Sequence, residues 1–326
     1  MGAIIFVRSG PGTGFYEVGR TIAHVLNIEI TNNPLDLLRR DTVLFVGSIY
    51  GSTIPLLFST ALRKKVVLYV TAEGPFNPGI RKFLVNNRVL VVTPSMYSAR
   101  ELIGQGMAVH KVVPHGIDTC ELPVLTHNNP SQPYIRILSI AGTDVYKVLG
   151  ARYLLRAFAR SKYLTRNSHL ILKVPSSYAR HFKELANNLG IHGKVDIISG
   201  YLSKSDLYTL MGNADLYVHA SLSDAFGLPI IESMAMGTPV VTLNAPPWNE
   251  IVNDNVGFLV RVKGEAILNY RPPYRVRIPD LRDLVKVLED AVSQVSTSLR
   301  RRVRDYGINQ FNAHKLYQAF KFLVEK

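Results

Sequence analysis

Short apolar runs alternate with amphipathic stretches along most of the chain. Nearly continuous hydrophobic runs are typical of strands that are buried on both faces of a sheet. Four such runs occur in the first third of the sequence: Ala3–Val7, Val43–Val46, Val66–Val70 and Val89–Val92. Between them, apolar residues recur at helical spacing, as from Phe15 to Leu26. This alternation predicts a parallel sheet covered by helices.

A polar stretch, Thr126–Pro133, continues neither kind of element, and we interpret it as an interdomain linker. The alternation then restarts at Ile135–Ala141. We therefore expect an α/β protein with two doubly wound Rossmann-like domains, residues 1–130 and 134–308, facing a central cleft. Residues 263–279 fit no simple pattern and are interpreted as an irregular insertion. In the second domain, the pattern predicts strands at His169–Val174, Val195–Ile198, Leu216–His219 and Val240–Leu243, and helices at Gly150–Ser161 and Ser176–Leu189.

The composition supports this organisation and excludes several classes of protein. A chain of 326 residues with 47% hydrophobic and 19% charged residues can bury two cores and is not disordered. No apolar run approaches the ~18 residues of a membrane-spanning helix, and no basic region precedes the first apolar run as a secretory signal would require. A single cysteine, Cys120, excludes an internal disulfide and a Cys-cluster metal site. We expect a cytoplasmic protein.

The formal net charge of +14 is unevenly distributed. Residues 1–130 contain 12 basic and 8 acidic residues, whereas the rest contains 26 and 16. Residues 145–183 hold nine basic residues and no acidic one. Such a field favours anionic partners such as phosphates, nucleic acid or an anionic membrane surface, although an ordinary basic surface explains the charge equally well.

The segment Ser221–Val241 carries the most informative combination of residues. A strand is expected to end at His219, and Pro229 is placed to open a helix that ends near Gly237. The N–H groups of Gly227 and Leu228 would then lie at a helix N-terminus, which suits hydroxyl or phosphate oxygens. Asp224 and Glu232 flank this junction and could bind two different polyols.

The run DAFGLPIIESMAMGTPVV from Asp224 to Val241 resembles the Glu-x7-Glu signature of the family 4 retaining glycosyltransferases, which have the GT-B fold. Residues 91–118, 200–221 and 250–260 resemble other family segments in the same order. The resemblance implies transfer of a sugar from a nucleotide-sugar to an acceptor with retained anomeric configuration, without a cofactor or a required metal. It also implies that residues 309–326 form a helix that packs back on the first domain.

Roles of individual residues follow from the same resemblance. Glu232 would hold the ribose hydroxyls, and the nucleobase would lie near Gly200–Leu202, so Leu202 is a candidate contact. The sugar ring and a phosphate oxygen would be held by Asp224 and by the backbone of Phe226, Gly227 and Leu228.

Two features depart from the family pattern. The first acid of the signature is Asp224 in place of Glu, which shortens the side chain by one methylene. The family's Arg and Lys of a G-R-x(4)-K-G motif are also displaced here. Gly142 is followed by Thr143 in place of Arg, and Lys147 stands three positions before Gly150. We predict that Lys147 supplies the cation for the diphosphate, with Arg152 as the substitute, against the alternative that Lys147 is an ordinary solvated lysine.

A glycine-rich loop, Ser9–Gly14, follows the first expected strand. It lacks the full G-x-G-x-x-G pattern and a P-loop lysine, so a tight structural turn explains it as well as a phosphate contact does. By resemblance, Gly12 and Gly14 would face the diphosphate. Two further candidates are Glu73, which follows a buried strand, and Glu250, which lies in a family-like segment.

Three alternatives stay open at this stage. One is an epimerase or phosphorylase on the same fold; another, weaker, is a dinucleotide-dependent oxidoreductase. The third is a basic protein that binds polyanions or membrane surfaces without transferase activity. The acceptor is undetermined and could be a glycan, a lipid or a protein, and no specific nucleic acid is expected. A peripheral membrane contact would be carried by Ile54–Lys65, an apolar stretch ending in three cations.

Overall fold

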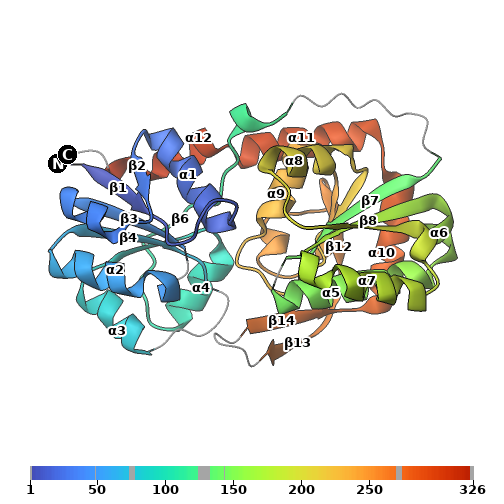
Figure 1. The fold of residues 1–326 in the computed structure, drawn as a ribbon, viewed down its shortest axis with the longest axis horizontal. Helices are drawn as coiled ribbons and strands as arrows, with labels where there is room; N and C mark the ends of the chain where they lie inside the picture. The colour runs from blue at the N-terminus through green and yellow to red at the C-terminus, as the bar shows by residue number, and fades with distance from the viewer. Residues whose placement is uncertain are drawn as a thin grey trace. The chain divides into compact units, whose positions relative to one another are not determined.

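The computed structural model describes residues 2–47, 49–72, 78–123, 133–142, 144–268 and 274–323. The chain divides into two compact units (Figure 1). Unit 1 contains the described residues up to Cys120 together with those from Phe311 onward, and unit 2 contains those from Glu121 to Gln310. The expected linker at residues 126–133 falls almost wholly outside the described residues.

Unit 1 is built on a six-stranded parallel sheet with strand order β2-β1-β3-β4-β5-β6. Its central strands are the apolar runs of the sequence, and residues such as Ile4, Phe45 and Leu68 are fully buried in the core. The short outer strands β2 and β6 were not predicted. The elements are β1 (Ala3–Phe6), α1 (Gly14–Leu26), β2 (Glu29–Thr31), the 3-10 helix η1 (Pro34–Arg39), β3 (Thr42–Gly47), α2 (Ile49–Ala61), β4 (Lys65–Val70), α3 (Pro78–Asn86), β5 (Leu90–Thr93), α4 (Met96–Gly104), β6 (Lys111–Val112), α12 (Ala313–Leu316) and η5 (Tyr317–Leu323).

The C-terminal segment packs within unit 1. Ile117 N–H donates to Phe311 O at 2.7 Å, and Ala313 N–H donates to Ile117 O at 3.0 Å, so the two segments pair like short parallel strands. A Cβ on Gly116 would lie 2.6 Å from the Cα of Ala313, which makes a glycine necessary at this close approach. In place of one helix over residues 309–326, the described part of this segment holds α12 and the 3-10 helix η5, and the buried Tyr317 and Phe320 anchor η5 in unit 1.

Unit 2 contains a second six-stranded parallel sheet, with order β12-β11-β10-β7-β8-β9. The two sheets and their helices confirm the expected two-domain α/β architecture. The elements are η2 (Thr119–Glu121), which leads into it, β7 (Ile135–Ile140), α5 (Val145–Arg160), α6 (Lys162–Asn167), β8 (Ser168–Val174), α7 (Ser176–Asn188), η3 (His192–Lys194), β9 (Val195–Ser199), α8 (Lys204–Asn213), β10 (Leu216–Val218), α9 (Leu228–Ala235), β11 (Val240–Leu243), η4 (Trp248–Glu250), β12 (Gly257–Val260), β13 (Val262–Leu268), β14 (Tyr274–Pro279), α10 (Leu281–Gln294) and α11 (Thr297–Gln310).

Two sequence expectations in unit 2 were wrong. Helix α5 begins at Val145, five residues before the expected start at Gly150. Gly150 lies inside the helix. A glycine is required there because α5 approaches the backbone after β10 so closely that an added Cβ would be 1.5 Å from Ala220 O. The stretch interpreted as an irregular insertion is an antiparallel hairpin, β13–β14, whose register shifts between Val262 and Gly264.

Candidate functional site

The strand order of unit 2 identifies the edge of the sheet where a ligand is expected. Chain connections run in one direction from β7 to β8 and β9 and in the other from β10 to β11 and β12. In open parallel sheets, ligands bind beyond the carboxyl ends of the strands at the point where this direction reverses. The loop containing Gly142 follows β7, and the loop with Asp224 follows β10. The topology therefore brings two of the predicted segments to one edge.

Asp224 lies in a setting that keeps its carboxylate charged. Ala225 N–H donates to its Oδ1 at 2.9 Å, and His219 Nε2 lies 3.4 Å from its Oδ2. Burial by itself would raise the pKa of Asp224, but the His219 side chain, the charge of Lys147 and the Phe226 N–H together hold the pKa below its usual value. Asp224 is therefore an acceptor at neutral pH.

Two buried residues of β10 and its end support Asp224, and sequence analysis missed both. Tyr217 Oη lies 3.3 Å from His219 Nδ1, and the other ring nitrogen of His219 faces Asp224. Burial raises the pKa of Tyr217 well above its usual value, and the nearby charges of Glu232 and Asp224 raise it further. The phenol is therefore protonated and can orient the imidazole. The position of His219 at a strand end was the signal that could have found it.

Helix α9 begins directly after a left-handed residue, Gly227, with φ of 105°. A Cβ there would lie 2.9 Å from Ile230 Cδ1 and 3.3 Å from Trp248 Cδ1, so only glycine fits. Leu228 is the first residue of the helix, and the first N–H groups of a helix have no partner within it. Glu232 is the fifth residue of α9, half-buried, and its charge acts on Tyr217 together with that of Asp224. The two signature acids therefore lie near one buried phenol.

Lys147 and Arg152 lie on the same helix but make different contacts. Lys147 Nζ is 2.9 Å from Asp144 Oδ2, and its stem packs so closely on Gly142 that a Cβ there would be 2.8 Å from Lys147 Cδ. Its charge also acts on Asp224. Arg152 instead donates through Nε to His181 Nε2 on α7 at 3.0 Å. The structure groups Lys147, and not Arg152, with Gly142 and Asp224.

The β13–β14 hairpin braces the loop that carries Asp224. Arg277 N–H donates to Leu222 O at 2.8 Å, and the buried Arg277 guanidinium lies 5.7 Å from the ring of Trp248. Trp248 is fully buried and also contacts the ring of His219, at 6.0 Å between centroids. Nothing in the alternation of the sequence indicated that residues 274–279 would support the signature loop.

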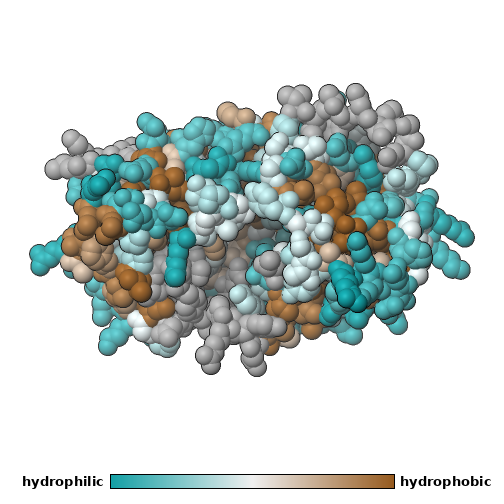
Figure 2. Space-filling model, viewed as in Figure 1, coloured by the Kyte–Doolittle hydropathy of each residue, from teal (hydrophilic) through white to brown (hydrophobic). Residues whose placement is uncertain are grey.

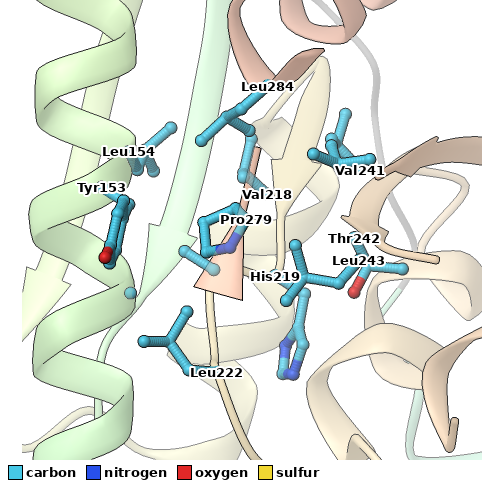
Figure 3. A pocket seen from close by; sticks show the side chains of 13 residues that line it. Tyr153, Leu154, Val218, His219, Leu222, Val241, Thr242, Leu243, Pro279 and Leu284 are labelled. Carbon is cyan, nitrogen blue, oxygen red and sulfur yellow. The ribbon is translucent and has the colours of Figure 1, made fainter. Parts of the chain in front are cut away.

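A small apolar pocket lies beside this loop and borders on His219 (Figure 3). Helix α5 contributes Tyr153 and Leu154 to its wall, and helix α10 contributes Leu284. Thr242 Oγ1 is buried there without a hydrogen-bond partner among the described residues. The apolar lining suits packing more than recognition of a charged ligand.

The other candidate residues are more dispersed. Leu202 is half-buried in the loop after β9, and Phe226 is buried. Gly12 and Gly14 are exposed in unit 1, where Gly12 N–H donates to Glu17 Oε1 at 3.4 Å, so a carboxylate of α1 already uses one of the loop amides. Glu250 is exposed in η4. Glu73 and Thr143 lie outside the described residues.

The part of the chain that matches a known protein family lies in unit 2. Residues 136–269 match the family model described as glycosyl transferases group 1. The chain is 35% identical over 141 residues to an MMP α-(1→4)-mannosyltransferase of Mycolicibacterium hassiacum. This alignment covers 43% of this chain and 33% of that protein. It is 26% identical over 220 residues to an α-monoglucosyldiacylglycerol synthase of Streptococcus pneumoniae, covering 62% of this chain and 49% of that one. These alignments span a third to a half of the two relatives.

A solved structure extends the likeness to the whole chain. The fold resembles that of Anabaena HepE, solved in complex with UDP and glucose, with a TM-score of 0.77 at 17% sequence identity and 99% of both chains covered. At this identity the likeness establishes the fold alone. The fold is GT-B, as the resemblance of the signature implied.

Proposed function

We propose that this chain, whose residues 136–269 match the family model of the glycosyl transferases group 1 and whose fold is GT-B, transfers a sugar from a nucleotide-sugar donor to an acceptor. The observation that carries the proposal is the grouping of Asp224, Glu232 and Lys147 at the carboxyl edge of the unit 2 sheet. The charge of Lys147 acts on Asp224, and the charges of both acids act on Tyr217.

The charged side chains suit different parts of a nucleotide-sugar. Glu232 accepts hydrogen bonds from the ribose hydroxyls, and the ionised Asp224 accepts from hydroxyls of the sugar. The N-terminus of α9 at Gly227 and Leu228 offers N–H groups to a phosphate oxygen. His219, held by Tyr217 and Trp248, is a positioning residue that fixes the Asp224 carboxylate.

We further propose that the reaction retains the anomeric configuration and needs no cofactor. The bond between the anomeric carbon of the sugar and the donor diphosphate breaks, and the acceptor hydroxyl oxygen bonds to that carbon. Negative charge grows on the departing diphosphate, and Lys147 stabilises this charge. The leaving phosphate then accepts the proton of the acceptor hydroxyl, so no protein base is required. The work of the site is positioning and charge stabilisation.

Donor hydrolysis and transfer, measured across a panel of nucleotide-sugars that includes UDP-glucose, test the proposal. The related HepE structure holds UDP and glucose, which supports starting from that donor. We expect release of the nucleoside diphosphate with at least one donor. Absence of turnover with every donor, combined with polyanion binding that weakens steeply with salt, would replace the transferase by a binding protein on the same fold.

Glu232→Ala is expected to weaken donor binding by one to two orders of magnitude. The substitution removes charge-assisted hydrogen bonds to the ribose, which contribute roughly 1.5–3 kcal/mol. Calorimetric titration with the donor checks this, with Glu184→Ala as the control because Glu184 is an exposed acid paired with Arg180 on α7. Unchanged affinity in a folded Glu232 variant would remove the ribose assignment.

Turnover is expected to continue in excess EDTA. Asp224 and Glu232 are committed to hydroxyl groups in this proposal, and neither belongs to the His–Asp–His group that is the candidate metal cluster among the described residues. The check is the steady-state rate before and after chelation. Loss of activity that Mg²⁺ or Mn²⁺ restores would point to a metal-dependent transfer mechanism.

The acceptor side of the proposal rests on an apolar surface of unit 1. Its exposed side chains come from η1, from α2 and from Leu62, which directly follows α2. Figure 2 shows apolar residues at the surface of the part of unit 1 where Figure 1 labels α2. In the described part of the chain, no helix has the length and apolar character to cross a bilayer. We propose that this face lies on an anionic membrane surface and that the acceptor is a lipid. The exposed apolar residues are Leu35, Leu38, Ile54, Leu57, Phe58 and Leu62.

Lys64 and Lys65, which follow α2, contribute less to membrane binding than two free cations would. Lys64 Nζ donates to the carbonyl oxygens of Leu38 and Arg40, and Lys65 Nζ donates to Phe322 O at 2.7 Å. Both ammonium groups are thus partly committed to unit 1 itself. The apolar residues, above all Ile54 with 79% of its surface exposed, should carry the attachment.

Ile54→Asp together with Leu57→Asp is expected to abolish sedimentation with anionic vesicles. The double variant places two negative charges on the face that would enter the lipid headgroups. Ile267→Asp, at an exposed apolar position of β13, serves as the control and should sediment like the unaltered protein. If the unaltered protein fails to sediment at low salt, the lipid acceptor is excluded.

A further inference from the structure

Three residues that are far apart in the sequence converge in unit 1, and the proposed function uses none of them. His24 lies in the last turn of α1, Asp118 in the loop after β6, and His314 on α12. His24 Nδ1 is 2.7 Å from Asp118 Oδ2, and His314 Nε2 is 3.4 Å from Asp118 Oδ1. One ligand atom from each residue lies within 4.8 Å of the other two.

We propose that His24, Asp118 and His314 form a binding site for a divalent transition-metal ion, with Zn²⁺ as the best match. Two imidazole nitrogens and one carboxylate oxygen are ligands that Zn²⁺ takes at about 2.0–2.2 Å, with a fourth position for water. The ion ties α1 to the C-terminal segment of unit 1.

The carboxylate at the centre of the group is prepared for a cation. The Asp118 side chain has only 1% of its surface exposed and is flanked by imidazoles on both oxygens. The Cys120 N–H donates to Asp118 Oδ1 at 3.0 Å, which fixes the orientation of the carboxylate between the two rings. A buried carboxylate with an imidazole nitrogen on each side provides three ligand groups for one divalent ion.

The geometry of the three residues is fixed by the backbone. The pairing of Ile117 with Phe311 and Ala313 sets Asp118 beside the start of α12. Within α12, Asn312 caps the helix through a hydrogen bond from Lys315 N–H to its Oδ1 at 3.2 Å, so the position of His314 is set as well. Such a framework holds metal ligands in place before the ion binds.

The ligand atoms need only small movements to take up tetrahedral geometry. Two atoms bonded to one Zn²⁺ at these lengths lie about 3.3 Å apart. His314 Nε2 already lies at this separation from Asp118 Oδ1, whereas His24 Nδ1 contacts the other carboxylate oxygen, Oδ2. One ligand atom of each residue lies within 4.8 Å of the others, so each pair has to close by at most about 1.5 Å. Because the His24 and His314 side chains are 57% and 43% exposed, an ion can reach them from solvent. His314 Nε2 is itself buried and makes no hydrogen bond among the described residues.

Binding of Zn²⁺ and Co²⁺ to the metal-stripped full chain tests the proposal. We expect one ion per chain in calorimetric titration with ZnCl₂, and the visible absorption of tetrahedral Co²⁺ when CoCl₂ replaces it. His24→Ala and His314→Ala should each weaken Zn²⁺ binding by at least tenfold. The conservative variants His24→Gln and His314→Gln should do the same, and far-ultraviolet circular dichroism verifies that each variant is folded.

His169→Ala is the matched control, because His169 Nε2 lies 2.9 Å from Asp196 Oδ2 but has no second imidazole beside that pair in the described part of unit 2. This variant should bind Zn²⁺ like the unaltered protein. The proposal is overturned if the unaltered chain binds no stoichiometric ion, or if all four His24 and His314 variants retain its affinity. Because the readout is metal binding, its outcome is independent of any sugar transfer.

Discussion

Replacing Lys147 with alanine is expected to lower turnover by about two orders of magnitude while changing donor affinity only a few-fold. The negative charge on the diphosphate is larger in the transition state than in the bound donor, and a cation that stabilises the growing charge contributes mainly to the rate. The stem of Lys147 packs on Gly142, and its charge reaches Asp224, so the ammonium belongs to the group at the sheet edge.

Arg152→Ala is the matched control for this prediction. Arg152 is a cation of the same helix whose Nε donates to His181, and its removal should leave the rate within a few-fold of the unaltered value. Steady-state kinetics separates the two effects, since kcat reports the loss of charge stabilisation and KM reports donor binding where chemistry is slow. Should Arg152→Ala abolish turnover while Lys147→Ala preserves it, the assignment of the displaced motif would have to be reversed.

Gly150→Ala is expected to destabilise the protein by at least about 3 kcal/mol. The added methyl carbon would lie 1.5 Å from Ala220 O, which is far inside any non-bonded distance. Helix α5 and the backbone leading to the signature loop would have to separate, and a displaced Asp224 would reduce activity in whatever fraction still folds. Urea unfolding followed by circular dichroism measures the loss.

The control for this substitution is Gly104→Ala, at the end of helix α4. No atom lies within 4 Å of a Cβ built on Gly104, so the methyl group meets open space. This variant is expected to be neutral or slightly stabilising, because alanine is favoured over glycine in a helix by up to about 1 kcal/mol. Equal stability of the Gly150 and Gly104 variants would show that α5 can move away from β10 without cost.

The central strands and the signature loop were accessible from the sequence. A strand buried on both faces has to be apolar almost throughout, so β1, β3, β4 and β5 stand out as runs that need no tertiary information. The order of residues from Asp224 to Val241 similarly indicated a loop, a helix with proline in its first turn and a following strand. These features are local, and a local pattern determines them.

Elements that depend on distant partners were not accessible in this way. The outer strands β2 and β6 are three and two residues long, too short to show a period. The hairpin β13–β14 alternates exposed and half-buried residues along β13, but its contacts with Leu222 and Trp248 arise only when the chain folds. The sequence pattern predicts that α5 starts at Gly150, whereas the helix begins at Val145. Position 150 requires a glycine because the backbone of Ala220 lies so close to it.

The sequence by itself therefore determined the fold class and the acids that the signature carries, since periodicity and motif order are properties of neighbouring residues. Only the tertiary structure decided which groups surround those acids. His219 and Tyr217 support Asp224 because β10 ends beside the loop. His24, Asp118 and His314 meet although 94 residues separate the first two, because backbone pairing returns the C-terminal segment to unit 1. The physical reason is that side-chain environments are created by contacts between segments, which no single stretch of sequence contains.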